Sequence, residues 1–138
     1  MAANRSLAGI AVDQRGRLFV AKRRPGGSLG GMWEFPGGKA ERGESDLTAL
    51  CREFSEEFGV AVAVCEHLGE SEFSNGDEVY SLGAYRVELL SADFRLTEHC
   101  EWRWATIDEI EAEGGFAPSD AALLPMVIEK LFGDWVIP

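Results

Sequence analysis

One uninterrupted amphipathic segment, residues 45–58, constrains the fold more than any other feature of this chain. It contains neither glycine nor proline, and its apolar residues recur at three- and four-residue spacing, at Leu47, Leu50, Phe54 and Phe58. This spacing is typical of a helix with one apolar face. Ser45 is a candidate N-cap and Gly59 a candidate C-terminal stop. The sequence therefore predicts a helix that ends at Phe58 and packs its apolar face against the core.

The other face of this predicted helix carries the carboxylates of Glu53, Glu56 and Glu57. Like charges at three- and four-residue spacing repel by roughly 0.2–0.5 kcal/mol per pair. A local conflict of this kind is typical of functional sites, and Mg²⁺ or Mn²⁺ would relieve it because both prefer oxygen ligands. Arg52 lies four residues before Glu56 and can hold its carboxylate. The alternative is an ordinary solvated acidic face.

The loop before the helix favours the metal site. Residues 35–38 read Phe-Pro-Gly-Gly, and glycine lets a main-chain carbonyl or amide approach an ion or phosphate closely. Together with the helix, this loop resembles the Nudix box: Gly, five residues, Glu, seven residues, then Arg-Glu-hydrophobic-any-Glu-Glu-any-Gly-hydrophobic. The specified positions are filled by Gly38, Glu44, Arg52, Glu53, Phe54, Glu56, Glu57, Gly59 and Val60.

The resemblance implies an α/β fold, a Nudix-type α/β/α sandwich with a mixed β-sheet, and metal-dependent hydrolysis of a phosphoanhydride. It also implies Mg²⁺ ligands, with Mn²⁺ as a possible substitute: the carbonyl of Gly37 or Gly38, and the carboxylates of Glu53, Glu56 and Glu57. The general base is either Glu53 or a carboxylate in a later loop. Glu44 is expected to order the loop and Arg52 rather than to bind metal.

Glu98 is the candidate for that later carboxylate, because MutT-like relatives commonly place an acidic residue there to contact metal or water. It is equally compatible with an ordinary loop glutamate, and the adjacent His99 is interpreted as incidental. Arg23 and Lys39 are candidates for phosphate or base contacts, with solvated charges as the alternative.

The run from Gly31 to Lys39 looks like the MutT-type branch, which cleaves nucleoside triphosphates to monophosphate and pyrophosphate. In that branch a residue after a proline, just before the last helix, reads the base edge, and Asp120 follows Pro118 here. Bacterial enzymes for oxidised guanine carry Asn at this place, so Asp is closer to relatives acting on cytosine nucleotides or several damaged bases. The expected substrate is a damaged or non-canonical nucleoside triphosphate, such as an oxidised guanine or modified cytosine nucleotide.

An ionised Asp120 only accepts hydrogen bonds, which suits the amino group of cytosine or the imino and amino groups of guanine. Protonation in an apolar pocket would change that preference. Alternatively, Asp120 belongs to the first turn of a helix capped by Ser119, where an acid favours the dipole. Phe35 and Phe73 are either stacking platforms for a base or core residues.

Two further functions remain open. One is hydrolysis of ADP-ribose or another nucleoside diphosphate-linked substrate with the same metals. Relatives of that kind usually have a proline soon after the box, whereas this chain has none between Pro36 and Pro118. The other is a nucleotide sensor without turnover; such modules often lose box carboxylates, and this chain retains them all.

The rest of the sequence predicts alternating strands and helices in one domain, residues 1–138. Residues 7–12 and 17–23 are expected to form a hairpin around the polar turn 13–16, and Asn75-Gly76 to form a second hairpin turn. The remaining predicted elements are strands at 60–64, 68–73, 78–89 and 101–105, a short helix capped by Thr106, and a last helix from Ser119 to about Phe132.

Charge and composition limit location and partners. The net charge of −11 over 138 residues disfavours long nucleic acids, whose phosphates need clustered Lys and Arg. No stretch approaches the roughly 18 apolar residues of a membrane span, and residues 1–8 lack the apolar core of a secretory signal. Three cysteines without CxxC spacing indicate a reducing, cytoplasmic environment. A small nucleotide is the expected partner; the sequence does not set an oligomeric state.

Overall fold

The structure is a computed structural model that describes residues 4–133. Residues 1–3, part of the N-terminal segment considered above for a secretory signal, lie outside the described residues. Strands and helices follow one another in the order β1 (Asn4–Ile10), β2 (Leu18–Arg23), β3 (Trp33–Glu34), β4 (Gly37–Lys39), α1 (Asp46–Phe58), β5 (Val62–Asn75), β6 (Glu78–Leu89), β7 (His99–Ala105), α2 (Ile107–Glu113), α3 (Pro118–Ala121) and α4 (Leu124–Phe132).

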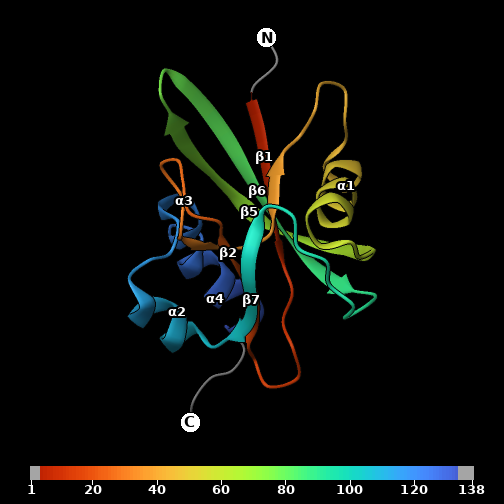
Figure 1. Cartoon of the computed structure of the whole chain (residues 1–138), viewed down its shortest axis with the longest axis vertical. Helices are drawn as coiled ribbons and strands as arrows, with labels where there is room; N and C mark the ends of the chain where they lie inside the picture. The colour runs from red at the N-terminus through yellow and green to blue at the C-terminus, as the bar shows by residue number, and fades with distance from the viewer. Residues whose placement is uncertain (1–3, 134–138) are drawn as a thin grey trace.

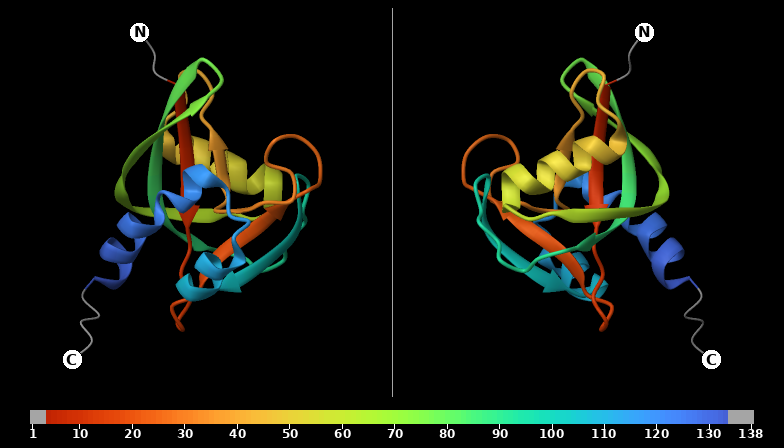
Figure 2. Two further views of the ribbon diagram at one scale, coloured as in Figure 1. Left: turned by 90° about the vertical axis from the view of Figure 1, so that its left-hand side faces the viewer. Right: turned by 90° about the vertical axis from the view of Figure 1, so that its right-hand side faces the viewer.

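The strands form two sheets with helices on both sides. The four-stranded sheet has the order β4-β1-β6-β5 and is mixed, because β1 and β6 run parallel while the other pairs are antiparallel. The three-stranded sheet, β3-β2-β7, is antiparallel. Helix α1 lies on one side of the strands and α2, α3 and α4 lie on the other (Figure 1). The two views of Figure 2 look at the molecule from opposite sides: α3 (blue) is in front in the left view and α1 (yellow) in the right view. The predicted α/β fold with a mixed sheet is confirmed.

Helix α1 packs on the sheet through aromatic side chains. Phe54 and Phe58 are fully buried and share an apolar cluster with Phe19 of β2. The helix can approach β1 closely because a Cβ at Gly9 would lie 2.5 Å from the Phe54 ring. Burial of each such side chain stabilises the fold by about 1.5–3 kcal/mol. A second cluster, beneath α2 and α4, contains Ile10, Leu18, Leu123 and Val127.

The prediction for α1 is correct at both ends of the helix. It is wrong for one residue on each face, because Leu47 of the predicted apolar face is exposed and Glu57 of the predicted acidic face is buried. Ser45 Oγ accepts a hydrogen bond from the Thr48 amide at 3.2 Å, and Gly59 has the left-handed φ of 68° that ends the helix. Leu47 is 54% exposed because it lies in the first turn, before the part of the helix that packs. Glu57, by contrast, is buried among the packed residues rather than presented to solvent.

The predicted hairpin of residues 7–12 and 17–23 is wrong as a sheet unit. The turn exists, since the Gly16 amide donates to the Asp13 carbonyl at 3.1 Å, but β1 and β2 belong to different sheets. The segment just after β1 pairs with β2 only through an isolated antiparallel bridge, Val12 with Leu18. β1 instead finds long-range partners in β4 and β6, which a local pattern does not reveal.

The predicted last helix is divided into α3 and α4. Ala117, not Ser119, precedes the first helical residue of α3, and Pro118 occupies the first turn. Pro125 cannot donate a backbone hydrogen bond into a preceding turn, so a new helix starts around it. The short helix α2 follows the prediction, with a capping box between Thr106 and Glu109.

The two strands predicted at 60–64 and 68–73 are one long strand, β5, with register shifts on either side of His67. β5 and β6 form the second predicted hairpin, in which Asn75 pairs with Glu78, so the turn lies at Gly76-Asp77, one residue later than predicted. Among residues 4–133, no helix has both the length and the apolar character to cross a membrane.

Candidate active site

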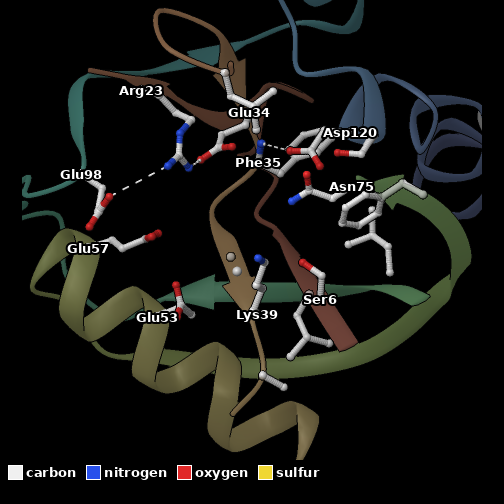
Figure 3. A pocket seen from close by; sticks show the side chains of 18 of the residues that line it. Ser6, Arg23, Glu34, Phe35, Lys39, Glu53, Glu57, Asn75, Glu98 and Asp120 are labelled. Atoms are coloured by element: carbon white, nitrogen blue, oxygen red, sulfur yellow. Dashed lines mark hydrogen bonds and ion pairs between the residues drawn. The ribbon is translucent and has the colours of Figure 1, made fainter. Parts of the chain in front are cut away.

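A cavity of about 550 Å³ lies between α1, β3, β4 and the β5–β6 hairpin (Figure 3). It brings together most of the predicted site residues: Arg23, Phe35, Gly37, Gly38, Lys39, Arg52, Glu53, Glu57, Phe73, Glu98 and Asp120. Glu53 and Glu57 extend into it from α1, while Glu34 and Asp120 lie at the opposite end. Glu44 and Glu56 are outside the cavity lining.

The glycine loop brings the backbone of β4 against α1. Gly37 and Gly38 pair with Ala8 and Leu7 of β1, which fixes the loop in the sheet. A Cβ at Gly38 would lie 2.8 Å from the Glu53 carboxyl carbon, so a larger residue would displace this carboxylate. Glycine at this position therefore lets Glu53 lie directly on the main chain.

Arg52 holds several carboxylates around α1 in place through hydrogen bonds. Its guanidinium donates to Glu44 at 2.7 and 2.9 Å, to Glu53 at 2.6 Å and to Glu56 at 3.0 Å. The hydrogen bonds from Arg52, followed by the one from the Glu41 amide, lower the pKa of Glu44 to about 2. Glu44 thus joins the loop to Arg52, and its role in ordering both for catalysis stays a prediction. The Glu56 side chain is 60% exposed, and its coordination of metal stays a prediction.

Glu57 is a buried carboxyl whose negative charge the surrounding protein does not neutralise. Burial, followed by the charges of Glu53, Glu34 and Glu98, raises the pKa of Glu57 to about 9. Its Oε1 atom is buried and has no hydrogen-bond partner within residues 4–133. A hard divalent cation would supply what this oxygen lacks.

The donors available to such a cation fit Mg²⁺ in kind. Glu53 and Glu57 share the cavity with the backbone of Gly37 and Gly38, and all these donors are oxygens. As they lie in this structure, no three His, Cys, Asp or Glu side chains of the described chain converge into a complete metal-binding group. Main-chain carbonyl and water oxygens would have to complete the coordination, which Mg²⁺ commonly accepts.

Asp120 closes the opposite end of the cavity. Its Oδ2 accepts a hydrogen bond from the Phe35 amide at 2.9 Å. Burial, followed by the nearby charge of Glu34, raises the pKa of Asp120 to about 7. The carboxyl is positioned by β3, because Trp33 exchanges backbone hydrogen bonds with Gly115 and Ala117, immediately before α3.

Sequence reasoning missed Glu34 and misjudged His99. Glu34 is 8% exposed and its Oε2 contacts Arg23 Nη1 at 3.1 Å and His99 Nε2 at 2.8 Å. His99 is fully buried in β7, not an incidental loop residue. The available signal was a charged residue between the aromatic residues Trp33 and Phe35, a position that is costly to bury without a polar role.

The aromatic and basic residues predicted to bind substrate line the cavity and also pack against neighbouring side chains. Phe35 makes an edge contact with Phe116, with ring centroids 5.2 Å apart. Phe73 stacks on Tyr80 at 5.1 Å, and Lys39 Nζ lies 4.9 Å from the Tyr80 ring centroid. Phe35 and Phe73 thus belong to the core and also line the cavity, and the stacking of a base on either ring stays a prediction.

Comparisons with known proteins agree on the family. The family model described as NUDIX domain matches residues 3–127. The Mycobacterium tuberculosis protein named "Putative 8-oxo-dGTP diphosphatase 2" is 35% identical over 119 residues, covering 84% of this chain and 82% of that protein. The Escherichia coli CTP pyrophosphohydrolase is 30% identical over 113 residues, covering 82% and 83%.

A solved structure extends the agreement to three dimensions. The solution structure of the E. coli ORF135 protein superposes with a TM-score of 0.83 at 27% identity, covering 99% of this chain and 96% of that one. The resemblance seen in residues 38–60 is thus confirmed over most of the chain. The chain belongs to the NUDIX domain family and is a Nudix hydrolase.

Proposed function

We propose that the protein hydrolyses a damaged or non-canonical nucleoside triphosphate to its monophosphate and pyrophosphate, with Mg²⁺ as the metal and Mn²⁺ as a substitute. One observation carries this proposal: a single cavity joins the carboxylates of α1, Glu53 and Glu57, to a second carboxylate pair, Glu34 and Asp120. The first pair suits a metal-bound polyphosphate and the second a base. Relatives named as an 8-oxo-dGTP diphosphatase and a CTP pyrophosphohydrolase support this substrate class.

At the metal end, Glu53, Glu57 and the carbonyl of Gly37 or Gly38 would hold the ion, with Glu56 and Glu98 as further candidates. When bound, Mg²⁺ neutralises charge on the phosphoryl oxygens and lowers the pKa of a coordinated water. Arg52 keeps the Glu53 carboxylate in place through a 2.6 Å hydrogen bond. Glu53, or Glu98 at the exposed rim, would take the proton from the attacking water.

At the base end, the protein already uses one oxygen of each carboxylate. Asp120 Oδ2 accepts from the Phe35 amide, and Glu34 Oε2 contacts both Arg23 and His99. Among residues 4–133, no hydrogen bond reaches Asp120 Oδ1 or Glu34 Oε1. Neither oxygen is among the fully buried polar atoms that lack a partner, so a ligand can reach both. Two acceptors thus remain for a base edge with N–H donors, which guanine and cytosine present.

A panel of normal, oxidised and methylated nucleoside triphosphates, together with ADP-ribose, tests the proposal in the presence of Mg²⁺. We expect pyrophosphate rather than phosphate as the product, and faster turnover of nucleotides whose base carries an amino group, such as guanine or cytosine derivatives, than of uracil nucleotides. Preference for ADP-ribose, or absence of pyrophosphate from every triphosphate, would overturn the proposal. Glu53→Gln is the control for contaminating activity, since it should keep the fold and lose turnover.

A further inference from the structure

His99 is a fully buried polar residue that contacts both α1 and Glu34 of the cavity lining. Its Nε2 lies 2.8 Å from Glu34 Oε2, and its ring stacks on Phe58 of α1 with centroids 5.0 Å apart and an angle of 21° between planes. The imidazole therefore connects the helix that carries Glu53 and Glu57 to the carboxylate at the base end.

The surroundings of His99 select one of its tautomers. Its Nδ1 is buried and has no hydrogen-bond partner among the described residues. A proton on Nδ1 would leave a buried N–H unsatisfied, whereas a proton on Nε2 is donated to Glu34. The hydrogen bond thus runs from His99 to Glu34.

This hydrogen bond acts on the orientation of Glu34. His99 and Arg23 both contact Oε2, which leaves Oε1 for a ligand in the cavity. Arg23 is a weak anchor by itself, because its side chain is 34% exposed and it also faces Glu98 at 4.0 Å. The fully buried imidazole supplies the directional constraint that the partly exposed guanidinium lacks.

We propose that His99 is a positioning residue for base selectivity: its Nε2–H holds Glu34 so that Oε1 faces the base edge. The inference rests on the proposed function, because it requires a nucleobase between Glu34 and Asp120. His99 itself does not touch the substrate. An apolar ring could pack on Phe58 equally well, so packing alone does not require a histidine here.

Three substitutions separate the hydrogen bond from the packing. His99→Phe keeps a ring on Phe58 and removes the donor. His99→Gln puts an amide N–H near the position of Nε2, whereas His99→Asn puts it near Nδ1, too short to reach Glu34. For each variant we would measure kcat and KM with CTP, dGTP, their oxidised forms and UTP, with pyrophosphate as the readout, alongside the thermal midpoint.

We expect His99→Phe and His99→Asn to lower the ratio of kcat/KM between the best nucleotide and UTP roughly tenfold or more, mainly through KM. His99→Gln should restore most of that ratio. In a Glu34→Gln background, His99→Phe should change selectivity little further. Equal loss on all nucleotides, or no recovery in His99→Gln, would overturn the inference.

A measurement on the unmodified residue covers variants that fail to fold. The ¹⁵N spectrum of His99 in the wild-type protein should show the Nε2-protonated tautomer, and Glu34→Ala should shift its Nε2 proton signal upfield. An Nδ1-protonated ring would contradict the inference even if the enzyme releases pyrophosphate normally. A wild-type protein that releases no pyrophosphate from any triphosphate would instead reject the proposed function.

Discussion

Arg52 and Glu44 form a bidentate ion pair, with Nε 2.7 Å from Oε2 and Nη2 2.9 Å from Oε1. This geometry turns the remaining guanidinium nitrogen, Nη1, towards Glu53 and Glu56 on the same helix. A residue from the loop therefore determines how the carboxylates of α1 are held. A planar guanidinium can make all these contacts at once, which an ammonium cannot.

Arg52→Lys should lower kcat/KM by about 10- to 100-fold, although the charge is conserved, because the bidentate pair and the contact with Glu53 cannot both survive. Steady-state kinetics at saturating Mg²⁺ measures the effect. Arg103→Lys is the matched control, since Arg103 also pairs with two glutamates but lies outside the cavity lining. Similar kinetics in both variants would argue against a special role for Arg52.

Gly38→Ala should lower turnover at least roughly tenfold, because the new methyl group would displace the Glu53 carboxylate from β4. Gly115→Ala is a suitable control: the nearest atom to a Cβ there, outside its chain neighbours, is 4.0 Å away. Kinetics and thermal unfolding should be measured together. If Gly38→Ala keeps full activity, Glu53 does not need its observed position.

Glu57→Gln should stabilise the metal-free protein while abolishing its response to Mg²⁺. The pKa of Glu57 is raised to about 9, so at pH 7 its burial costs on the order of a few kcal/mol relative to the unfolded chain, and a glutamine avoids this cost. Thermal midpoints in EDTA and in Mg²⁺ test both parts. A wild-type midpoint that does not rise with Mg²⁺ would contradict binding at Glu57.

Asp120 should make stability depend on pH in a window set by its raised pKa. The carboxyl holds its proton more tightly when folded, with a pKa of about 7 against an ordinary value of 3.8. Its contribution to stability is therefore complete below pH ~4 and is lost as pH rises through about 7. In EDTA, wild type should lose on the order of a few kcal/mol relative to Asp120→Asn between these limits.

Urea unfolding of both proteins from pH 4 to pH 8 measures this difference. Asp120→Asn is a matched variant because its amide oxygen can still accept from the Phe35 amide. Base preference should change around pH 7, where the folded carboxyl titrates, since a protonated Asp120 can donate where the ionised form only accepts. Parallel stability curves for the two proteins would contradict the raised pKa.

The sequence alone determined the carboxylate cluster of α1, the proposed metal end of the site, because its parts are local. Ser45, the apolar spacing of Leu50, Phe54 and Phe58, and Gly59 define α1 within a few helical turns. Once the start and the apolar face of the helix are known, the helical repeat fixes which carboxylates lie near one another. Arg52 reaches Glu56 because the two residues are four positions apart. The match to the box added the family and the expected chemistry.

The proposed base end, with Glu34 and Asp120, was decided by tertiary structure. Asp120 meets the Phe35 amide 85 residues away because Trp33 pairs with the backbone just before α3. His99 meets Glu34 because β3 and β7 both pair with β2. Strand pairing between distant segments carries little signal in local patterns, which is why the sequence predicts the wrong neighbour for β1. Burial then set the chemistry: the raised pKa values of Glu57 and Asp120 come from their surroundings, which residue type and spacing do not specify.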